Sequence, residues 1–468
     1  MIHRSRRSAV AAFAVATAGA LVLAGCSGEQ PEATEDGPVT LTITTNAITG
    51  GKNAAEADWI ADWVIPEFEA AMEEDGRDVT VEFEPQGVDD ENYKTKIALD
   101  LQSGEGADII GMDGIWVGEF AEAGYIEPLA DVAGDAVDSW DGWDQIPEAV
   151  QAALSFDDQR YGVPQGADGR VLYYNKTLFA QAGLPADWQP ESWDDVLDAA
   201  RDLKQLEGVT PIQLNAGTAM GEATTMQGLL PLLVGTGEQV YEDGKWVGDT
   251  QGLRDVLDLY RTIYVDEGLG DAVLQQEAAG RDTSFQLFAS NQIGILLEGD
   301  YFWRSVINPA EGIGTAPMAD RDTAVGYTKI PAMEPGSGIK DQDFVSMSGG
   351  TGRVLNPNSE HPELAWELLA FMNSAEAYEA RNATTISITP RTDVNDEILA
   401  EDPMLTYVSE EVLPITAYRP PLAAYPQVST ALQQATLDVV SGGSVDDAMS
   451  AYVDSVKDIV GDDAVSGD

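Results

Sequence analysis

The chain has few of the residues on which catalytic chemistry usually depends. Of its 468 residues, one is cysteine and two are histidines. A single thiol excludes an internal disulfide framework, and two histidines leave little material for Ser-His-Asp catalysis or for a His-based zinc site. One of the two, His361, lies at the expected start of a helix, where it needs no special role. We therefore assign no catalytic residue, no metal site and no cofactor.

Positive charge is also scarce. The chain has 25 basic and 81 acidic residues, a formal net charge of −56. Such a field repels nucleic acid and anionic lipid, keeps a protein soluble, and disfavours a highly anionic ligand such as a sugar phosphate. An acidic composition that reflects only organism or habitat is the simpler interpretation. We expect no nucleic-acid partner.

Long apolar runs are absent beyond the N-terminus. Arg4, Arg6 and Arg7 precede an apolar stretch, 9–23, that is too short for an ordinary membrane span. The stretch ends in Leu-Ala-Gly-Cys, which resembles a bacterial lipobox. The resemblance implies a lipoprotein signal peptide (1–25), cleavage before Cys26, and a diacylglycerol on the Cys26 thiol. An uncleaved anchor helix, an ordinary signal peptide and twin-arginine export remain open.

The segment that follows Cys26 differs in composition from the rest of the chain. Residues 26–38 are rich in Ser, Glu, Pro, Thr and Gly and contain hardly any apolar residue, which is typical of a flexible tether. No later stretch approaches ~18 consecutive apolar residues. We expect a soluble body outside the cytoplasm, held to the bacterial cell membrane through the lipid on Cys26.

The start of the body alternates between strand and helix patterns. Strands are predicted at 39–44, 79–83 and 108–111, with helical patterns between them. Pro66 must kink or split the first helix. A β-α-β-α-β order implies a parallel sheet covered by helices, with ligands beyond the carboxyl ends of its strands. Those ends are the loops 46–53, 85–90 and 112–116.

The most informative segment is Tyr161 to Leu197, YGVPQGADGRVLYYNKTLFAQAGLPADWQPESWDDVL. Val171–Tyr174 has the bias of a buried strand, and Ser192 with Asp195 indicates a capped helix start. At the same spacing, the segment resembles the YGVP…LYYNK.LF..AGL block of extracellular solute-binding proteins of carbohydrate ABC importers. The further segments that resemble this maltose/oligosaccharide-binding-protein-like family are 108–129, 292–304, 348–372 and 388–393.

The resemblance implies an α/β fold of two lobes, the periplasmic-binding-protein-like fold. Each lobe is expected to be a mainly parallel sheet flanked by helices, with a hinge of crossing segments between them. By analogy, lobe 1 comprises 39–152 and 343–391, and lobe 2 comprises 158–340 and 392–468. The crossover depends on the resemblance alone, because hydrophobic periodicity does not reveal it.

Sugar binding needs aromatic faces for the C–H surfaces of a pyranose, and forked donors or acceptors for its hydroxyls. The predicted ligand-binding residues are Trp303, Asp300, Tyr301, Asp113, Trp116, Gln165, Asp168, Gly51, Asn53, Gly350 and Arg419. Trp303 matches the stacking tryptophan of the family, Asp300 is the acceptor beside it, and Trp116 is expected to stack from the opposite lobe.

Each of these residues also has a structural interpretation. The tryptophans can be packing residues, Asp113 and Asn53 helix caps, and Arg419 a surface ion pair. Gln165 and Asp168 can belong to an ordinary turn. The two glycines are candidates because glycine lets a ligand approach the backbone.

The resulting hypothesis is a binding protein, with no catalysis. It captures a mono- or oligosaccharide between its lobes, as a monomer, and delivers it to the permease of an ABC importer. Two alternatives remain. One is the same fold with a polyamine, osmolyte or peptide as its ligand. The other is a secreted glycoside hydrolase, which needs a pair of carboxylates that a chain with 81 acidic residues could contain by chance.

Overall fold

A computed structural model of the chain describes residues 37–51, 53–88, 90–311, 313–383 and 386–467. Within it, Val39–Asp468 form one compact unit. The predicted signal peptide, Cys26 and nearly all of the predicted tether lie outside the described residues. In the part of the chain that is described, no helix is long and apolar enough to cross a membrane.

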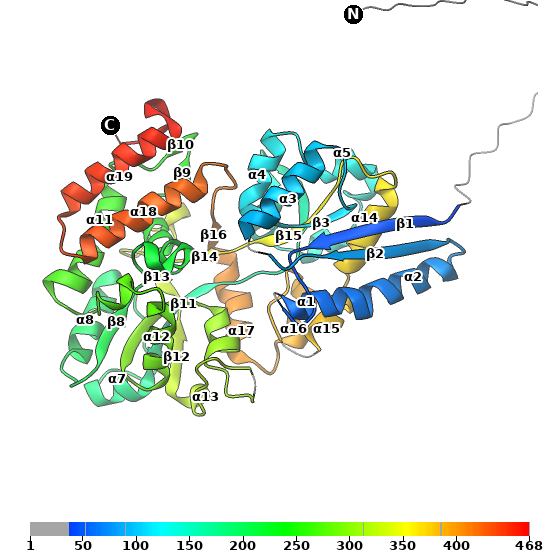
Figure 1. Ribbon diagram of the computed structural model, residues 1–468. Helices are drawn as coiled ribbons and strands as arrows, with labels where there is room; N and C mark the ends of the chain where they lie inside the picture. Colours follow the sequence, from blue (N-terminus) through cyan, green and yellow to red (C-terminus); the bar gives the residue numbers. More distant parts are fainter. Residues whose placement is uncertain (1–36, 52, 89, 312, 384–385, 468) are drawn as a thin grey trace, which may run out of the picture. The chain divides into compact units, whose positions relative to one another are not determined.

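The first sheet has five strands in the order β2-β1-β3-β15-β6 (Figure 1). Its strands are β1 (Val39–Thr45), β2 (Val79–Pro85), β3 (Ile109–Asp113), β6 (Gly162–Pro164) and β15 (Thr351–Leu355). β1 is parallel to both β2 and β3, whereas β15 is antiparallel to both β3 and β6. The three strands predicted at the start of the body are confirmed, and so is their parallel arrangement.

The helix after β1 is divided where proline requires it. It consists of α1 (Ala54–Trp59), a π-helical turn η1 (Ile60–Val64) and α2 (Ile65–Glu74). Pro66 has no amide hydrogen and its ring displaces the carbonyl four residues earlier, so the regular hydrogen-bond ladder cannot continue through it. The predicted division of this helix is confirmed. The first sheet is also covered by α3 (Asp90–Gln102) and α4 (Gly114–Glu122).

The second sheet has four strands in the order β12-β7-β11-β8. They are β7 (Arg170–Asn175), β8 (Thr210–Gln213), β11 (Ile293–Gly299) and β12 (Val325–Thr328). Only β11 and β8 are parallel, while β7 is antiparallel to both of its neighbours. β7 thus runs opposite to the other three strands, which share one direction. The direction of β7 follows from where the chain enters this sheet. β7 begins beside the last residue of β11, so that Arg170 lies opposite Gly299.

A small third sheet adjoins the segments that cross between these two. It has the order β13-β14-β16, with β13 (Ile330–Pro331), β14 (Phe344–Ser348) and β16 (Thr416–Tyr418). The chain leaves the first sheet between β6 and β7, at 165–169, and returns to it between β14 and β15, at 349–350. We call 165–169 and 349–350 the crossing segments. The predicted lobe boundaries stay predictions.

The helices of the second half follow the predicted capping signals. Ser192 accepts a hydrogen bond from the Asp195 amide at 3.2 Å and starts α8 (Trp193–Leu203). α7 (Lys176–Ala182) ends at Gly183, whose positive φ suits glycine. The remaining helices are α5 (Leu129–Ala133), α6 (Glu148–Gln151), α9 (Glu222–Thr224), α10 (Leu230–Val234), α11 (Gln251–Arg261), α12 (Gly280–Ala289), α13 (Arg321–Ala324), α14 (Pro362–Met372), α15 (Ala375–Asn382), α16 (Thr392–Ile398), α17 (Pro403–Tyr407), α18 (Tyr425–Val440) and α19 (Val445–Val460). The remaining strands form two short hairpins, β4 (Ser155–Phe156) with β5 (Gln159–Arg160), and β9 (Tyr241–Glu242) with β10 (Lys245–Trp246).

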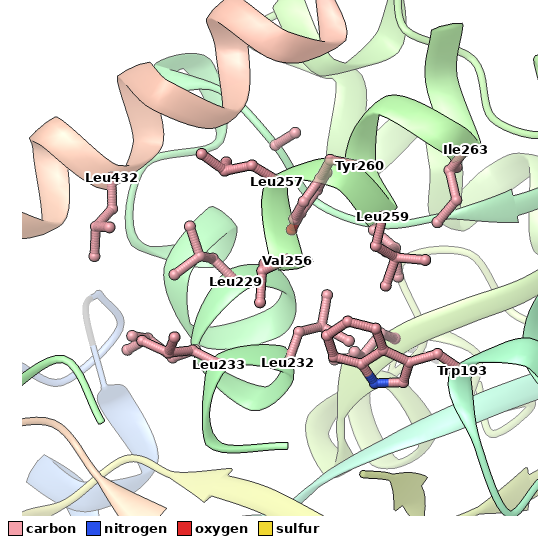
Figure 2. Packing of buried hydrophobic residues seen from close by; sticks show 14 of the residues in the cluster. Trp193, Leu229, Leu232, Leu233, Val256, Leu257, Leu259, Tyr260, Ile263 and Leu432 are labelled. Atoms are coloured by element: carbon pink, nitrogen blue, oxygen red, sulfur yellow. The ribbon is translucent and has the colours of Figure 1, made fainter. Parts of the chain in front are cut away.

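Large aliphatic side chains fill the core beside the second sheet. Figure 2 shows Val256 and Tyr260 of α11 between Leu432 of α18 and the apolar residues of α10. These side chains are buried, and complete burial of one Leu or Val stabilises a fold by about 1.5–3 kcal/mol. This core anchors the strands whose ends carry the polar residues described below.

Gly118 is one position where the fold requires close packing. A Cβ atom there would overlap the Pro421 carbonyl oxygen, which packs against α4. We expect Gly118→Ala to lower the free energy of unfolding by about 1–3 kcal/mol, measured by urea denaturation. Gly166→Ala is the matched control, since nothing lies within 4 Å of the added carbon. Equal losses in the two variants would contradict the prediction.

Candidate functional site

A cavity of about 620 Å³ lies where the ends of the strands and the crossing segments meet. Its lining is mostly polar. The lining residues are Asn53, Ala54, Ala55, Glu56, Asp113, Gln165, Gly166, Ala167, Asp168, Arg170, Arg304, Gly349, Gly350, Thr351, Tyr378, Arg381, Asn382, Ser387, Ile388, Thr389 and Arg419. They come from the first sheet, the second sheet and both crossing segments, so one ligand can contact all of these parts.

The structure brings six of the predicted site residues together around this cavity. They are Asn53, Asp113, Gln165, Asp168, Gly350 and Arg419. Asn53 follows β1 and Asp113 ends β3, as expected of residues at the carboxyl ends of parallel strands. The predicted loop after β2 contributes no described residue to the lining. That these six bind a ligand stays a prediction.

Asp168 and Arg170 form an ion pair at the crossing from the first sheet to the second. Their side chains approach to 2.7 Å, and Asp168 also accepts hydrogen bonds from the Gly349 amide at 2.6 Å and the Ser348 hydroxyl at 3.1 Å. Burial opposes ionisation of Asp168, but the Arg170 charge and these hydrogen bonds hold its pKa below the usual value. The carboxylate is therefore charged at neutral pH and joins both crossing segments.

A second charged group combines Asp113, Arg419 and Glu222. Arg419 lies 3.6 Å from Asp113 and 3.2 Å from Glu222, and its side chain is mostly buried. Asp113 also caps α4, because it accepts a hydrogen bond from the Ile115 amide at 3.1 Å. The structure shows the cap, and the same carboxylate lines the cavity. Arg419 does form an ion pair, but its side chain is mostly buried, whereas the structural interpretation expected a pair on the surface.

The other predicted residues at the cavity are held by the backbone. The Gln165 amide donates to the Thr351 carbonyl at 3.0 Å, and the buried Gln165 Oε1 has no hydrogen-bond partner among the described residues. The Gly350 carbonyl accepts from the Gly114 amide at 2.7 Å. Asn53 has a positive φ and donates from its side chain to the Asn46 carbonyl at 2.9 Å. These bonds give the rim of the cavity a defined shape.

The two predicted stacking tryptophans do not line this cavity. Trp303 is 4% exposed, lies under the guanidinium of Arg321 at 3.9 Å, and donates to Asp402 at 3.1 Å. Trp116 is 8% exposed and packs 6.3 Å from the ring of Tyr93. The packing interpretation describes both, because each helix turns its indole into the core. Trp303 does border a separate cavity of about 490 Å³.

Asp300, Tyr301 and Gly51 are also placed away from the cavity lining. Asp300 is 1% exposed and bonds to Arg304 at 3.0 Å, while the Tyr301 hydroxyl donates to Glu298. Burial raises the pKa of Asp300, and the Arg304 charge opposes that shift. Asp300 thus positions an arginine that lines the cavity. Gly51 is exposed, and its amide donates to the Ile48 carbonyl at 3.0 Å.

Sequence reasoning missed five charged or aromatic residues at the cavity, namely Glu56, Arg170, Arg304, Tyr378 and Arg381. All but Arg170 lie on helical segments, where a polar residue usually indicates only a solvated face. Arg170 and Arg304 had a signal, because they lie in the segments 161–197 and 292–304 that resemble the family.

The chemistry of the lining suits binding. It offers carboxylates, guanidinium groups, amides and hydroxyls, which can form forked hydrogen bonds to a polar ligand. Among the described residues, no group of three or more His, Cys, Asp or Glu side chains is arranged to hold a metal ion.

Comparison with known sequences decides the family. The sequence profile described as "Bacterial extracellular solute-binding protein" matches residues 53–379, well over half of the chain. The chain belongs to this family. The solute-binding protein is 24% identical to the diacetylchitobiose binding protein DasA of Streptomyces coelicolor over 392 residues, 82% of each chain. It is 25% identical to an arabinooligosaccharide-binding protein of Halalkalibacterium halodurans over 268 residues, 55% of this chain and 54% of that protein.

Solved structures agree with this assignment at the level of fold. The cyclic alpha-maltosyl-1,6-maltose binding protein of Arthrobacter globiformis superposes with a TM-score of 0.69 at 21% identity, covering 91% of this chain and all of that one. The solute-binding protein therefore has the two-lobed α/β fold that the sequence analysis expected. Like the family, it is a binding protein that acts outside the cytoplasm.

The Asp168–Arg170 pair predicts a pH-dependent contribution to the stability of the solute-binding protein. A lowered carboxyl pKa stabilises the fold above the unfolded value of about 3.9, and this contribution is lost as pH falls through the folded value. We expect Asp168→Asn to lower the free energy of unfolding by about 1.5–3 kcal/mol at pH 7. Chemical denaturation should show the gap to wild type shrinking below about pH 4.

Asp198→Asn is the control, because the Asp198 side chain is 73% exposed and its pair with Arg201 is worth little. A gap between Asp168→Asn and wild type that stays constant from pH 7 to pH 3 would refute the assigned role of the Asp168 charge.

Proposed function

We propose that the solute-binding protein captures a mono- or oligosaccharide in the 620 Å³ cavity and delivers it to the permease of an ABC importer. The observation that carries the proposal is that residues of both sheets and of both crossing segments line one cavity, to which the sheets and the segment 165–169 contribute polar side chains. The membership of the family and the similarity to the two oligosaccharide-binding relatives support the same conclusion.

The proposed mechanism is closure of two lobes around the ligand. A ligand that enters between the lobes contacts one of them first, and hinge motion brings the other into contact. Closure is favoured only by contacts that exist in the closed state. We propose that the hinge consists of the segments 165–169 and 349–350, joined by the Asp168 hydrogen bond to Gly349. The closed monomer is then the form that the permease recognises.

We assign ligand contact to the six predicted residues that line the cavity. Asp113 and Asp168 accept from sugar hydroxyls, and Arg419, Gln165 and Asn53 donate to them. Gly350 offers only its backbone to the ligand, since a Cβ atom there would overlap the side chain of Ala153.

The first test is a thermal-shift screen of Ser27–Asp468 against mono- and oligosaccharides, polyamines and amino acids. A ligand that binds only the native state stabilises it by about 2.7 kcal/mol at ~100-fold excess over its dissociation constant. We expect a saccharide to raise the melting temperature. If only cationic ligands do so, the sugar assignment fails while the binding fold stands.

Two variants distinguish a residue that lines the cavity from a residue that packs in the core. We expect Asp113→Asn to weaken saccharide binding about tenfold or more, by calorimetry, because the ligand loses a charged acceptor. Trp303→Ala is the contrasting variant. It should lower the free energy of unfolding by about 3–5 kcal/mol and leave the affinity unchanged, since Trp303 packs in the core. Loss of binding in Trp303→Ala alone would favour its predicted stacking role instead.

We also propose that Cys26 carries the lipid that anchors the protein. The lipobox-like Leu-Ala-Gly-Cys sequence and the tether-like composition of 26–38 support this. We expect Cys26→Ser, expressed in a bacterium with the lipoprotein pathway, to move the protein from the membrane fraction to the soluble fraction and to abolish labelling with radioactive palmitate. Unchanged membrane retention and labelling would rule the anchor out.

A further inference from the structure

Two guanidinium groups flank one indole ring at an end of the cavity. Arg353 lies 5.3 Å and Arg381 5.5 Å from the centre of the Trp59 ring. Glu56 and Tyr378 complete this group, which joins α1, β15 and α15. We call these five residues the α1–α15 corner. Glu56, Tyr378 and Arg381 of the corner line the cavity, and Arg353 lies beneath them.

The corner holds one carboxylate for two guanidinium groups. Glu56 is bonded to Arg353 at 2.8 Å, and Arg353 is 0% exposed. Burial lowers the pKa of Arg353, the Glu56 charge opposes that shift, and the Arg381 charge adds to it. Arg353 Nε and Nη1 have no hydrogen-bond partner among the described residues. Glu56 is thus committed to Arg353 and does not neutralise Arg381.

Arg381 differs from every other arginine that the structure describes. Each of the others lies within 4.0 Å of a carboxylate, and Arg381 alone does not, in a chain that has 81 acidic residues. Its Nη1 donates to the Gln165 carbonyl at 2.8 Å, and its other donors have no hydrogen-bond partner among the described residues. The unpaired guanidinium lines the cavity.

An unpaired arginine in such an acidic chain is informative because carboxylates are abundant everywhere else. The planar guanidinium fork matches a carboxylate with two parallel hydrogen bonds, and such charge-assisted bonds are stronger than those to a neutral hydroxyl. The distant acidic residues do not cancel this local preference, since exposed charges beyond about 8 Å are largely screened at physiological salt.

Resting on the saccharide-binding function proposed above, we infer that the ligand carries one carboxylate group, which Arg381 binds. The substrate class is therefore an acidic saccharide, one that contains a uronic acid. A single carboxylate balances the single excess charge of the corner. A phosphate monoester, with close to two charges, would leave one charge uncompensated beside Glu56, Asp113 and Asp168.

The competing explanation for Arg381 is structural. It occupies the last turn of α15, where a cation interacts favourably with the negative end of the helix dipole. That role predicts a loss of stability when the charge is removed, and it predicts no preference among ligands. Binding selectivity therefore separates the two explanations.

The experiment compares sugars that differ only at C6. Calorimetry on Ser27–Asp468 uses galactose, glucose and mannose, their uronic acids and their 6-phosphates, and the corresponding di- and trisaccharides. We expect at least one uronic acid to bind about tenfold or more tightly than its neutral counterpart. Arg381→Gln should remove this preference, and Arg381→Lys should retain part of it.

Arg160→Gln is the matched control. Arg160 also lies over an indole ring, 4.3 Å from the centre of Trp143, but it pairs with Asp138 and does not line the cavity. We expect it to leave the preference unchanged. The wild-type comparison of acid and neutral sugar decides the inference even if Arg381→Gln does not fold.

Each contrary outcome has a distinct meaning. If a neutral sugar binds as well as its uronic acid, the carboxylate inference is wrong and the saccharide function stands. If the 6-phosphate binds most tightly, the anionic group is a phosphate and the inference is overturned in favour of it. If no sugar of any kind binds, the proposed function fails and the inference fails with it.

Discussion

The arrangement of the molecule depends on the ion pair between Asp168 and Arg170. Asp168 lies in the segment that leaves the first sheet, and Arg170 begins the central part of the second. The same carboxylate accepts hydrogen bonds from Ser348, the last residue of β14, and from Gly349 of the other crossing segment. One partly buried carboxylate therefore holds together the two places where the chain passes between the sheets. Removing either partner would leave an uncompensated charge, which is far more costly than the pair itself is stabilising.

This constraint explains why the cavity is polar. Crossing segments cannot satisfy their backbone groups within a sheet, so they need side-chain partners such as Asp168, Ser348 and Arg381. The ends of β1 and β3 open beside them and contribute Asn53 and Asp113. The resulting lining combines groups that secure the hinge with groups that a ligand can use. In the mechanism proposed above, binding and lobe movement are coupled because they share residues.

The charges that line the cavity differ from the net charge of the chain. The chain as a whole is strongly acidic, yet the cavity lining includes four arginines, namely Arg170, Arg304, Arg381 and Arg419. Three of them are paired with carboxylates and one is not. Net charge describes solubility and long-range interactions, whereas recognition depends on the few charges that a ligand contacts. The net charge of the chain therefore does not describe the charges that line the cavity.

The sequence by itself determined the local elements and the family. Hydrophobic alternation predicted the three N-terminal strands, Pro66 predicted the divided helix, and Ser192 predicted the start of α8, because each depends on the chemistry of a few neighbouring residues. Loop position also predicted Asn53 and Asp113 at the cavity, since the carboxyl ends of parallel strands share one edge, and segments that resemble the family supplied the other four predicted residues that line it. Only the tertiary structure decided the direction of β7, the burial of Trp303 and Trp116, and the presence of Arg381 and Glu56 at the cavity. Those features depend on which helix faces which sheet, and that is set by packing between residues far apart in the chain.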